Sequence, residues 1–251
     1  MARSLIDFDP RREELELREY LGDGYDHLRL QAYERQLEDE FVACGDEHAF
    51  YRTSEAYLYN LTAFAMTGTK LPYLRELVRL LPPGSRVLDY GCGIGSDGLA
   101  LLEAGYEVEF ADFDNPSAAY LRWRMLRRGV EAPVHDLDRS VPSGFDGAYS
   151  FDVIEHVADP HGFLGELERR ADLVVVNLLE PEPDETDLHH ELPISSLVGR
   201  ALDQRLRSYR IHHRRSHLVA YHPVEGCPGR PARLAGQARL ALGRTRRRLG
   251  R

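Results

Sequence analysis

The chain of 251 residues contains little cysteine, a single lysine and no long apolar run. Its three cysteines, Cys44, Cys92 and Cys227, are odd in number and far apart, a pattern that disfavours a disulfide framework. A membrane-spanning helix needs roughly 20 consecutive apolar residues, and no stretch approaches that length. The N-terminal stretch also lacks the apolar segment of a secretory signal. We therefore expect a cytoplasmic protein with no membrane partner.

Basic residues are concentrated near the C-terminus of a chain that is acidic overall. The formal net charge is -9, yet fourteen arginines and only two acidic residues lie between Ser195 and Arg251. A basic tail of this kind occurs in nucleic-acid-binding proteins. Because Lys70 is the only lysine, however, arginine is simply the basic residue that this chain uses throughout. We therefore predict no nucleic-acid partner.

The most informative stretch is RVLDYGCGIGSDGLALLEA, residues 86–104, where a short apolar strand runs into a glycine-rich turn and then into a helix. Because Gly91, Gly93 and Gly95 have no Cβ, a ligand can approach the backbone closely. The unpaired N–H groups at the start of the helix attract negative charge. The strand carries Asp89, however, which would repel a pyrophosphate, and the third glycine comes one residue earlier than in a dinucleotide-binding loop. These features predict a cationic or zwitterionic ligand.

After this turn, apolar strands alternate with helices, which is typical of a parallel sheet covered by helices on both faces. The predicted strands are Tyr106–Ala111, Ala132–His135, Asp146–Phe151 and Leu173–Leu178, followed by an antiparallel hairpin of Leu206–His213 and His217–His222. The predicted helices are Tyr25–Phe41, Phe50–Met66 and Pro72–Leu80 before the turn, and Pro116–Arg128, a segment ending at Arg170, and Pro193–Asp203 after it. Residues 180–192 are predicted to form a long loop.

The glycine-rich turn, together with Asp112, Asp136 and the stretch FDGAYSFDVIEHV that begins at Phe145, resembles the class I S-adenosylmethionine-dependent methyltransferases. The resemblance covers about residues 86–170. It implies an α/β fold with a seven-stranded, mostly parallel sheet, helices on both faces and a final antiparallel hairpin. It also implies S-adenosyl-L-methionine as the cofactor. The expected parts are a helical cap or lid over residues 1–81, a Rossmann-like cofactor domain over 82–224 and a basic C-terminal tail over 225–251.

The resemblance assigns the cofactor contacts to the carboxyl ends of the strands. Asp89, with the backbone of the glycine turn, would hold the methionine part and accept a hydrogen bond from its amino group, directly or through water. Asp112 would accept from both ribose hydroxyls. Asp136 would accept from the adenine amine, and Phe113 would stack on the adenine ring. The full expected set is Asp89, Gly91, Gly93, Gly95, Asp112, Phe113, Asp136, Leu137 and Phe151.

Catalysis is expected to depend mainly on holding the methyl acceptor about 3–3.5 Å from the methyl carbon and in line with it. An acceptor that must lose a proton also needs a base, and imidazole suits neutral pH. His156, which follows the predicted fourth strand, is the first candidate; the alternative is that Glu155 and His156 only shape the pocket. Tyr57 in the cap is the second catalytic candidate, because aromatic faces stabilise positive charge. Its alternative role is core packing.

Substrate contacts are expected from the cap and from the loop after the fifth strand. His189 and His190 in that loop, with acidic residues just before them, could bind a metal. Adjacent histidines in an extended chain point in opposite directions, however. We therefore predict no metal site and, instead, a contact between one of the two histidines and the substrate. The predicted substrate-binding residues are Tyr51, Tyr59, His189 and His190.

The sequence thus predicts a methyltransferase that acts on an oxygen or nitrogen of a small molecule in secondary or specialised metabolism. One alternative is an enzyme that acts on the methionyl chain of the same cofactor, by cyclisation or aminocarboxypropyl transfer, and releases methylthioadenosine. Another is a non-catalytic methyltransferase-like subunit. The identity of the acceptor and the oligomeric state are left open by the sequence.

Overall fold

The computed structural model describes residue 6 and residues 8–180 and 188–224. The chain divides into two compact units, Met1–Pro142 and Ser143–Arg251. The predicted cap boundary after residue 81 lies inside the first unit, because the N-terminal helices group with the first strands. The predicted basic tail over residues 225–251, and residues 181–187 of the predicted loop, lie outside the described residues.

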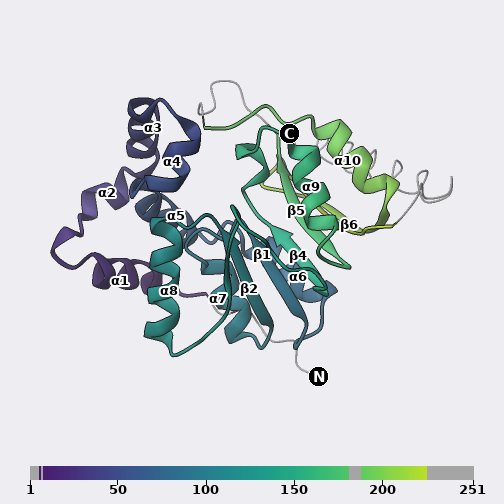
Figure 1. Ribbon diagram of the computed structural model, residues 1–251, viewed down its shortest axis with the longest axis horizontal. Helices are drawn as coiled ribbons and strands as arrows, with labels where there is room; N and C mark the ends of the chain where they lie inside the picture. Colours follow the sequence, from purple (N-terminus) through teal and green to yellow (C-terminus); the bar gives the residue numbers. More distant parts are fainter. Residues whose placement is uncertain (1–5, 7, 181–187, 225–251) are drawn as a thin grey trace. The chain divides into compact units, whose positions relative to one another are not determined.

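A run of short helices opens the first unit (Figure 1). These are α1 (Pro10–Leu21), α2 (His27–Gln31), α3 (Tyr33–Cys44), α4 (Glu47–Thr53), α5 (Ala56–Met66) and α6 (Leu71–Leu80), with a 3-10 turn η1 (Gly22–Gly24) after α1. The predicted helix over residues 25–41 is divided at Ala32, and the one over residues 50–66 is divided at Ser54. Ser54 is extended (ψ 127°) and its hydroxyl accepts a hydrogen bond from the Ala56 N–H group at 3.1 Å. The serine thereby ends α4 and allows α5 to start in a new direction.

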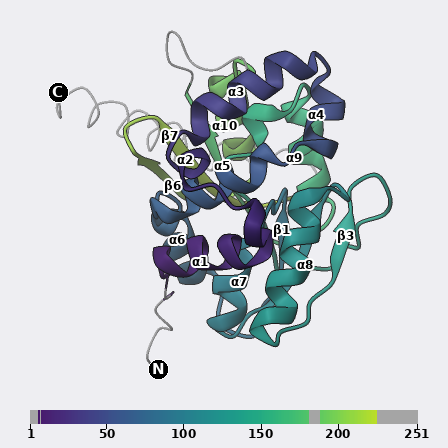
Figure 2. The ribbon, with the colours of Figure 1, turned by 90° about the vertical axis from the view of Figure 1, so that its left-hand side faces the viewer.

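Three parallel strands complete the first unit. They are β1 (Arg86–Tyr90), β2 (Glu107–Asp112) and β3 (Val134–Asp136), joined by α7 (Ser96–Glu103) and α8 (Pro116–Arg128). Their order is β3-β2-β1, and the register places Asp112 directly opposite Asp136. Because parallel strands end at the same edge of a sheet, the predicted cofactor residues of β1, β2 and β3 gather along one edge. Figures 1 and 2 both show α1 beside α8.

The second unit carries the remaining strands and the hairpin. Its elements are β4 (Gly147–Ser150), a 3-10 turn η2 (Ile154–His156), α9 (Pro160–Glu168), β5 (Val174–Leu179), α10 (Ile194–Asp203), β6 (Arg205–His212) and β7 (Ser216–His222). Strand β5 pairs with β4 in parallel and with β7 antiparallel, and β7 pairs antiparallel with β6. The apolar run of β5 is buried over Val174–Leu178, as its composition predicts for a strand covered on both faces.

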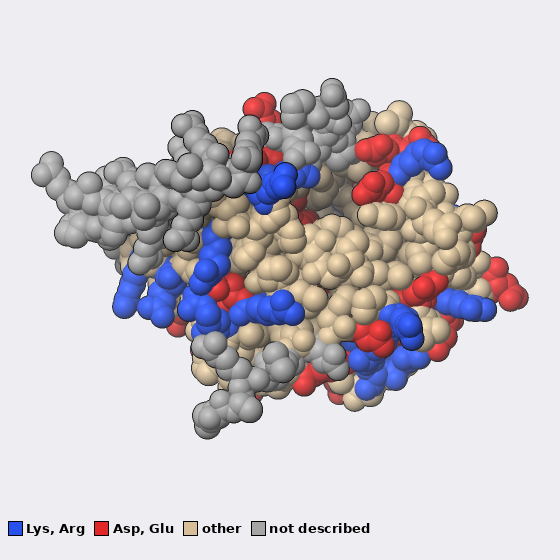
Figure 3. All heavy atoms as spheres, turned by 180° about the vertical axis from the view of Figure 1, so that it is seen from behind, with Lys and Arg blue, Asp and Glu red and all other residues tan. Residues whose placement is uncertain are grey.

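The predicted fold class is confirmed. The seven strands form a mixed α/β sheet that is mostly parallel, and it ends in the antiparallel arrangement β5-β7-β6. Among the described residues, no helix is long and apolar enough to cross a membrane. On the face drawn in Figure 3, basic and acidic side chains lie next to one another around a broad area of uncharged residues.

Candidate functional site

The glycine-rich turn follows β1 with a backbone that only glycine adopts readily. Gly91, Gly93 and Gly95 have φ values of 77°, 53° and 72°, in the left-handed region. Steric crowding also requires glycine at two of these positions. A Cβ on Gly93 would lie 2.7 Å from the Leu61 side chain, and one on Gly95 would lie 2.3 Å from the Leu121 side chain. The turn is therefore held in a fixed shape by its own backbone and by the helices packed around it.

Asp112, at the end of β2, connects the second strand to the glycine turn. Its Oδ2 accepts a hydrogen bond from the Gly93 N–H group at 2.6 Å, and its Oδ1 accepts one from the Phe113 N–H group at 2.7 Å. Burial raises the pKa of Asp112 to about 6, although these two N–H groups lower it in part. A carboxylate has about four lone-pair sites, so two remain for further donors. This number suits a pair of neighbouring hydroxyl groups.

Asp136 lies beside Asp112, at the end of the adjacent strand β3. Its Oδ1 accepts from the Asp138 N–H group at 3.0 Å. The Leu137 N–H group donates to the backbone oxygen of Asp112 at 3.0 Å, which ties the two strand ends together. The structure thus brings Asp112, Asp136 and Leu137 to one place beside the glycine turn, as the sequence predicts.

An arginine from the helical region closes this edge. The Arg52 guanidinium, at the end of α4, lies 4.1 Å from the centroid of the Phe113 ring. It also donates to both carboxylate oxygens of Asp138, at 2.6 and 3.1 Å. The sequence analysis did not identify this contact, because residues 52 and 138 are far apart in the chain. Arg52 therefore holds α4 against the loop that follows β3.

A buried ion cluster supports the glycine turn through bonds to Ile94 and Ser96. Arg124 of α8 is fully buried and donates to Glu13 Oε1 at 2.6 Å and to Glu16 Oε2 at 2.8 Å. It also donates to the Ile94 carbonyl oxygen at 2.8 Å and to the Ser96 hydroxyl at 2.9 Å. The cluster joins α1, α8 and the start of α7. Sequence reasoning missed it, since only a folded chain brings these helices together.

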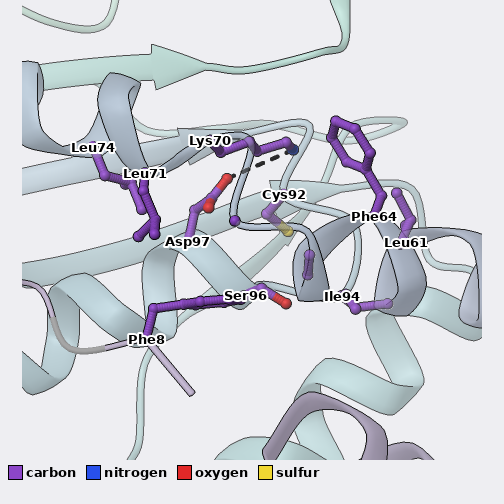
Figure 4. A pocket seen from close by; sticks show the side chains of 12 residues that line it. Phe8, Leu61, Phe64, Lys70, Leu71, Leu74, Cys92, Ile94, Ser96 and Asp97 are labelled. Atoms are coloured by element: carbon purple, nitrogen blue, oxygen red, sulfur yellow. Dashed lines mark ion pairs between the residues drawn. The ribbon is translucent and has the colours of Figure 1, made fainter. Parts of the chain in front are cut away.

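A pocket opens beside the start of α7 (Figure 4). It encloses about 470 Å³ of empty space, part of it open to solvent, and Leu61, Phe64, Lys70, Cys92 and Asp97 are among its lining residues. The Lys70 ammonium and an Asp97 carboxylate oxygen are 3.6 Å apart. Burial raises the pKa of the Cys92 thiol well above its ordinary value, which argues against a nucleophilic role. The pocket therefore offers one cation and one anion on an otherwise largely apolar surface.

Asp89 does not line this pocket. Its side chain is 4% exposed, and its Oδ2 would lie 2.9 Å from a Cβ on Gly98. The carboxylate thus faces α7 from within the core. A contact of Asp89 with a ligand amino group, directly or through water, stays a prediction, whereas the partly exposed Asp97 lines the pocket itself.

The tyrosines of the helical region have different roles. Tyr51 and Tyr57 pack together, with ring centroids 5.6 Å apart. Burial raises the pKa of Tyr57 far above its ordinary value, and Tyr51 and Asp112 add to the effect. Tyr57 is therefore protonated at neutral pH, where it can donate a hydrogen bond but cannot serve as a base. Tyr59 is 3% exposed, and its hydroxyl bonds the Asp26 N–H group at 2.9 Å and the Gly24 carbonyl at 3.2 Å. This gives Tyr59 a packing role in place of the predicted substrate contact.

In the second unit, Asp152 follows β4 in a strained conformation. Its φ is 55°, which is unusual for a residue other than glycine. Asn177 of β5, fully buried, accepts from the Asp152 N–H group at 2.8 Å and donates to its Oδ1 at 2.6 Å. Asp152 Oδ2 is buried without a hydrogen-bond partner among the described residues. Strain of this kind is typical of functional sites, and the sequence analysis did not single out either residue.

Two histidines of the second unit meet, one from the turn after β4 and one from the loop after β5. The rings of His156 and His189 have centroids 4.7 Å apart at an angle of 69°. Nδ1 of His156 lies 2.9 Å from the Leu188 carbonyl oxygen. The exposed His190 points its backbone N–H group at the Glu155 carbonyl oxygen, at 2.7 Å. Thus His156 and His189, predicted in separate roles, belong to one cluster.

Phe151, expected in the cofactor set, is buried in the same unit. Its ring packs on that of Tyr149, with centroids 4.9 Å apart. The side chain is 3% exposed, so it contributes to the core around the end of β4.

A family model described as a methyltransferase domain matches residues 66–210, more than half of the chain. The chain belongs to the class I methyltransferase family. This confirms the resemblance predicted from the glycine turn and the later strand ends.

Relatives and solved structures agree with this assignment. The ubiquinone biosynthesis O-methyltransferase of Xanthomonas campestris pv. campestris (strain B100) is 33% identical over 101 residues, which cover 38% of this chain and 41% of that protein. The chain therefore spans about two fifths of the length of the curated relatives it matches. Magnesium protoporphyrin IX methyltransferase from Synechocystis PCC 6803, solved with bound SAM, is similar over 68% of this chain and 85% of its own, with a TM-score of 0.50 and 16% identity. A protein from Pyrococcus horikoshii OT3 is similar over 63% of this chain and 92% of its own, with a TM-score of 0.52 and 15% identity. At these identities the structural likeness shows the fold.

The cofactor of this methyltransferase family is S-adenosylmethionine, and the first unit fits it. The Asp112 carboxylate, which bonds the Gly93 and Phe113 N–H groups, has two further lone-pair sites beside the glycine turn. The pocket beside α7 carries the opposite charges of Lys70 and Asp97. These features match a ligand with a diol at one end and a zwitterionic amino acid at the other.

Proposed function

We propose that this methyltransferase-family chain transfers the methyl group of S-adenosylmethionine to an oxygen or nitrogen of a small molecule. The observation that carries the proposal is the Asp112 carboxylate, which is bonded to the glycine turn and has two lone-pair sites left beside Asp136. A methyl group on a sulfonium is an electrophile with a good leaving group. The protein then has to bind the cofactor, orient the acceptor towards the methyl group and remove a proton from the acceptor.

Binding is divided among residues of the first unit. Asp112 accepts from the two ribose hydroxyls, and Asp136 accepts from the adenine amine. Lys70 attracts the carboxylate of the methionine part, while Asp97 attracts its ammonium group. Each of these contacts is a charge-assisted hydrogen bond, roughly twice as strong as a neutral one.

Orientation of the acceptor supplies most of the rate enhancement. Holding the acceptor about 3–3.5 Å from the methyl carbon in line with the sulfonium is worth up to roughly 7–11 kcal/mol. The α4 helix, held by Arg52 on Phe113 and Asp138, limits access of water to the adenine end.

His156 is the base of choice for an acceptor that must lose a proton. A carbonyl oxygen can only accept, so the contact with Leu188 requires Nδ1 of His156 to carry the hydrogen. Nε2 is then free of a proton in the neutral ring and can accept one. Tyr57, protonated at neutral pH, assists only as a donor or through its aromatic face.

The acceptor proposed is a hydroxyl-bearing small molecule of a biosynthetic pathway, met in the cytoplasm. The named function of the Xanthomonas relative, an O-methyltransferase of ubiquinone biosynthesis, supports an oxygen acceptor.

The test is to incubate the protein with S-adenosylmethionine, measure the affinity by calorimetry and analyse the products by mass spectrometry. We expect binding that is lost in Asp112→Ala, no conversion of the cofactor alone, and S-adenosylhomocysteine once hydroxyl compounds are added. Methylthioadenosine formed without an acceptor would replace methyl transfer by chemistry on the methionyl chain. Absence of binding would refute the assignment of the cofactor site.

A further inference from the structure

We propose that Glu155, His156 and His189 form a binding site for a divalent transition-metal ion of the zinc type. Each of the three residues offers one ligand atom, and these atoms all lie within 4.8 Å of one another. Glu155 is 2% exposed. Glu155 and His156 come from η2 after β4, and His189 comes from the loop after β5. Two imidazoles and one carboxylate are a common ligand set of zinc sites with an open position.

The His156 ring is already in the state that a metal needs. Its Nδ1 donates to the Leu188 carbonyl oxygen at 2.9 Å, so the lone pair of the neutral ring lies on Nε2. Metal-bound histidines almost always donate their second ring N–H group in this way, because the bond fixes the tautomer and the ring orientation.

The residues on either side of His189 in the sequence hold it near the other two ligands. Leu188, which precedes it, is 5% exposed and accepts from His156, and His190, which follows it, donates its backbone N–H group to the Glu155 carbonyl oxygen at 2.7 Å. These two bonds fasten the loop to η2. The sequence prediction of no metal site considered His189 together with His190 and not with residues 33 and 34 positions earlier.

The geometry requires a modest closing movement. Zinc binds nitrogen and oxygen ligands at about 2.0–2.2 Å, so ligand atoms in a tetrahedral site are about 3.3–3.6 Å apart. The present spacing, up to 4.8 Å, is wider than this by at most about 1.2–1.5 Å. His189 is partly exposed, and rotation of its side chain can supply the difference.

The ion deepens the proposed function, and this step depends on that function. A hydroxyl of the acceptor that occupies the open position becomes more acidic, because the ion stabilises the oxyanion. Its proton would pass to water, which leaves the oxygen as the nucleophile. His156 then acts as a ligand, and the ion replaces it as the group that promotes proton loss.

The test measures binding of Zn²⁺ to the full chain after treatment with a chelator, without cofactor or acceptor. We expect about one ion per chain by elemental mass spectrometry and by calorimetry. His189→Gln and Glu155→Gln should weaken the affinity about 10–100-fold or more, whereas His190→Gln, which alters the neighbouring exposed side chain, should bind like the parent. No binding, or equal loss in His190→Gln, would overturn the proposal.

A second measurement needs no variant and therefore does not depend on the folding of one. Diethyl pyrocarbonate acylates accessible imidazoles, and mass spectrometry of peptides locates the product. Zn²⁺ should protect His156 and His189 and leave His190 reactive. Equal modification with and without Zn²⁺ would refute the site. Because neither measurement involves S-adenosylmethionine, failure here leaves the cofactor site standing, and failure of cofactor binding leaves the metal site standing.

Discussion

Replacement of Arg124 by methionine tests whether the buried ion cluster supports the glycine turn. Arg124 is fully buried against Glu13 and Glu16. Removing one member of a buried ion pair costs about 3–5 kcal/mol, because the partner charge stays buried without compensation. Arg128 still reaches Glu16 at 2.7 Å, so we expect the lower part of this range. Typical domains have only about 5–15 kcal/mol of stability, so the effect should be large.

The assay is urea denaturation followed by fluorescence of the single tryptophan, Trp123. Trp123 lies next to Arg124 and packs on Tyr20 and Tyr120, with ring centroids 5.4 and 5.9 Å apart, so it reports unfolding of the first unit. Arg127→Met is the matched control. It lies on the same helix, but its main ion pair, with Glu19, is partly exposed, where pairs contribute little, and its contact with the buried Glu16 is longer, at 3.4 Å.

Cofactor affinity supplies a second readout of the same variant. Loss of Arg124 frees the Ile94 carbonyl and the Ser96 hydroxyl beside the glycine turn. We therefore expect weaker binding of S-adenosylmethionine in Arg124→Met and parental binding in Arg127→Met. If both variants lose the same small amount of stability, the cluster does not hold the turn and the reasoning is refuted.

Three further predictions concern cofactor binding. The ribose hydroxyls need the ionised form of Asp112 as their acceptor, and burial raises the pKa of Asp112 to about 6. The affinity for S-adenosylmethionine should therefore fall about tenfold per pH unit as the pH drops below 6. Calorimetry on Asp112→Asn should show weak binding without this pH dependence. Lys70→Met should cost about 1.5–3 kcal/mol of binding free energy, and unchanged affinity would remove Lys70 from the site. Arg52→Ala should speed cofactor release and increase hydrogen exchange of α4; stopped-flow rates equal to those of the parent would show that the contact with Asp138 does not retain the cofactor.

Much of the proposed cofactor site follows from local sequence. The turn at Gly91, Gly93 and Gly95 was predictable because its shape depends on glycine at alternate positions after a strand. Asp112 and Asp136 were predictable because they end consecutive parallel strands, whose carboxyl ends share an edge. The helix over residues 25–41 was predicted as one element, since apolar spacing does not record the break at Ala32.

What the sequence did not reveal depends on distances between segments far apart in the chain. Asp152 is held by Asn177, and His156 meets His189, because β4 and β5 lie side by side. No spacing rule gives the second residue of such a pair from the first.

By itself, then, the sequence determined the family, the order of strands and helices and the residues at the strand ends, because these follow from short-range periodicity and glycine conformation. Only the tertiary structure decided which charges are buried together and which side chains reach the site. Arg124 could have been a solvated residue of α8, and Tyr59 a substrate contact. Burial among particular neighbours gave each its role, because the cost of a buried charge or hydroxyl depends on the partners that packing brings to it.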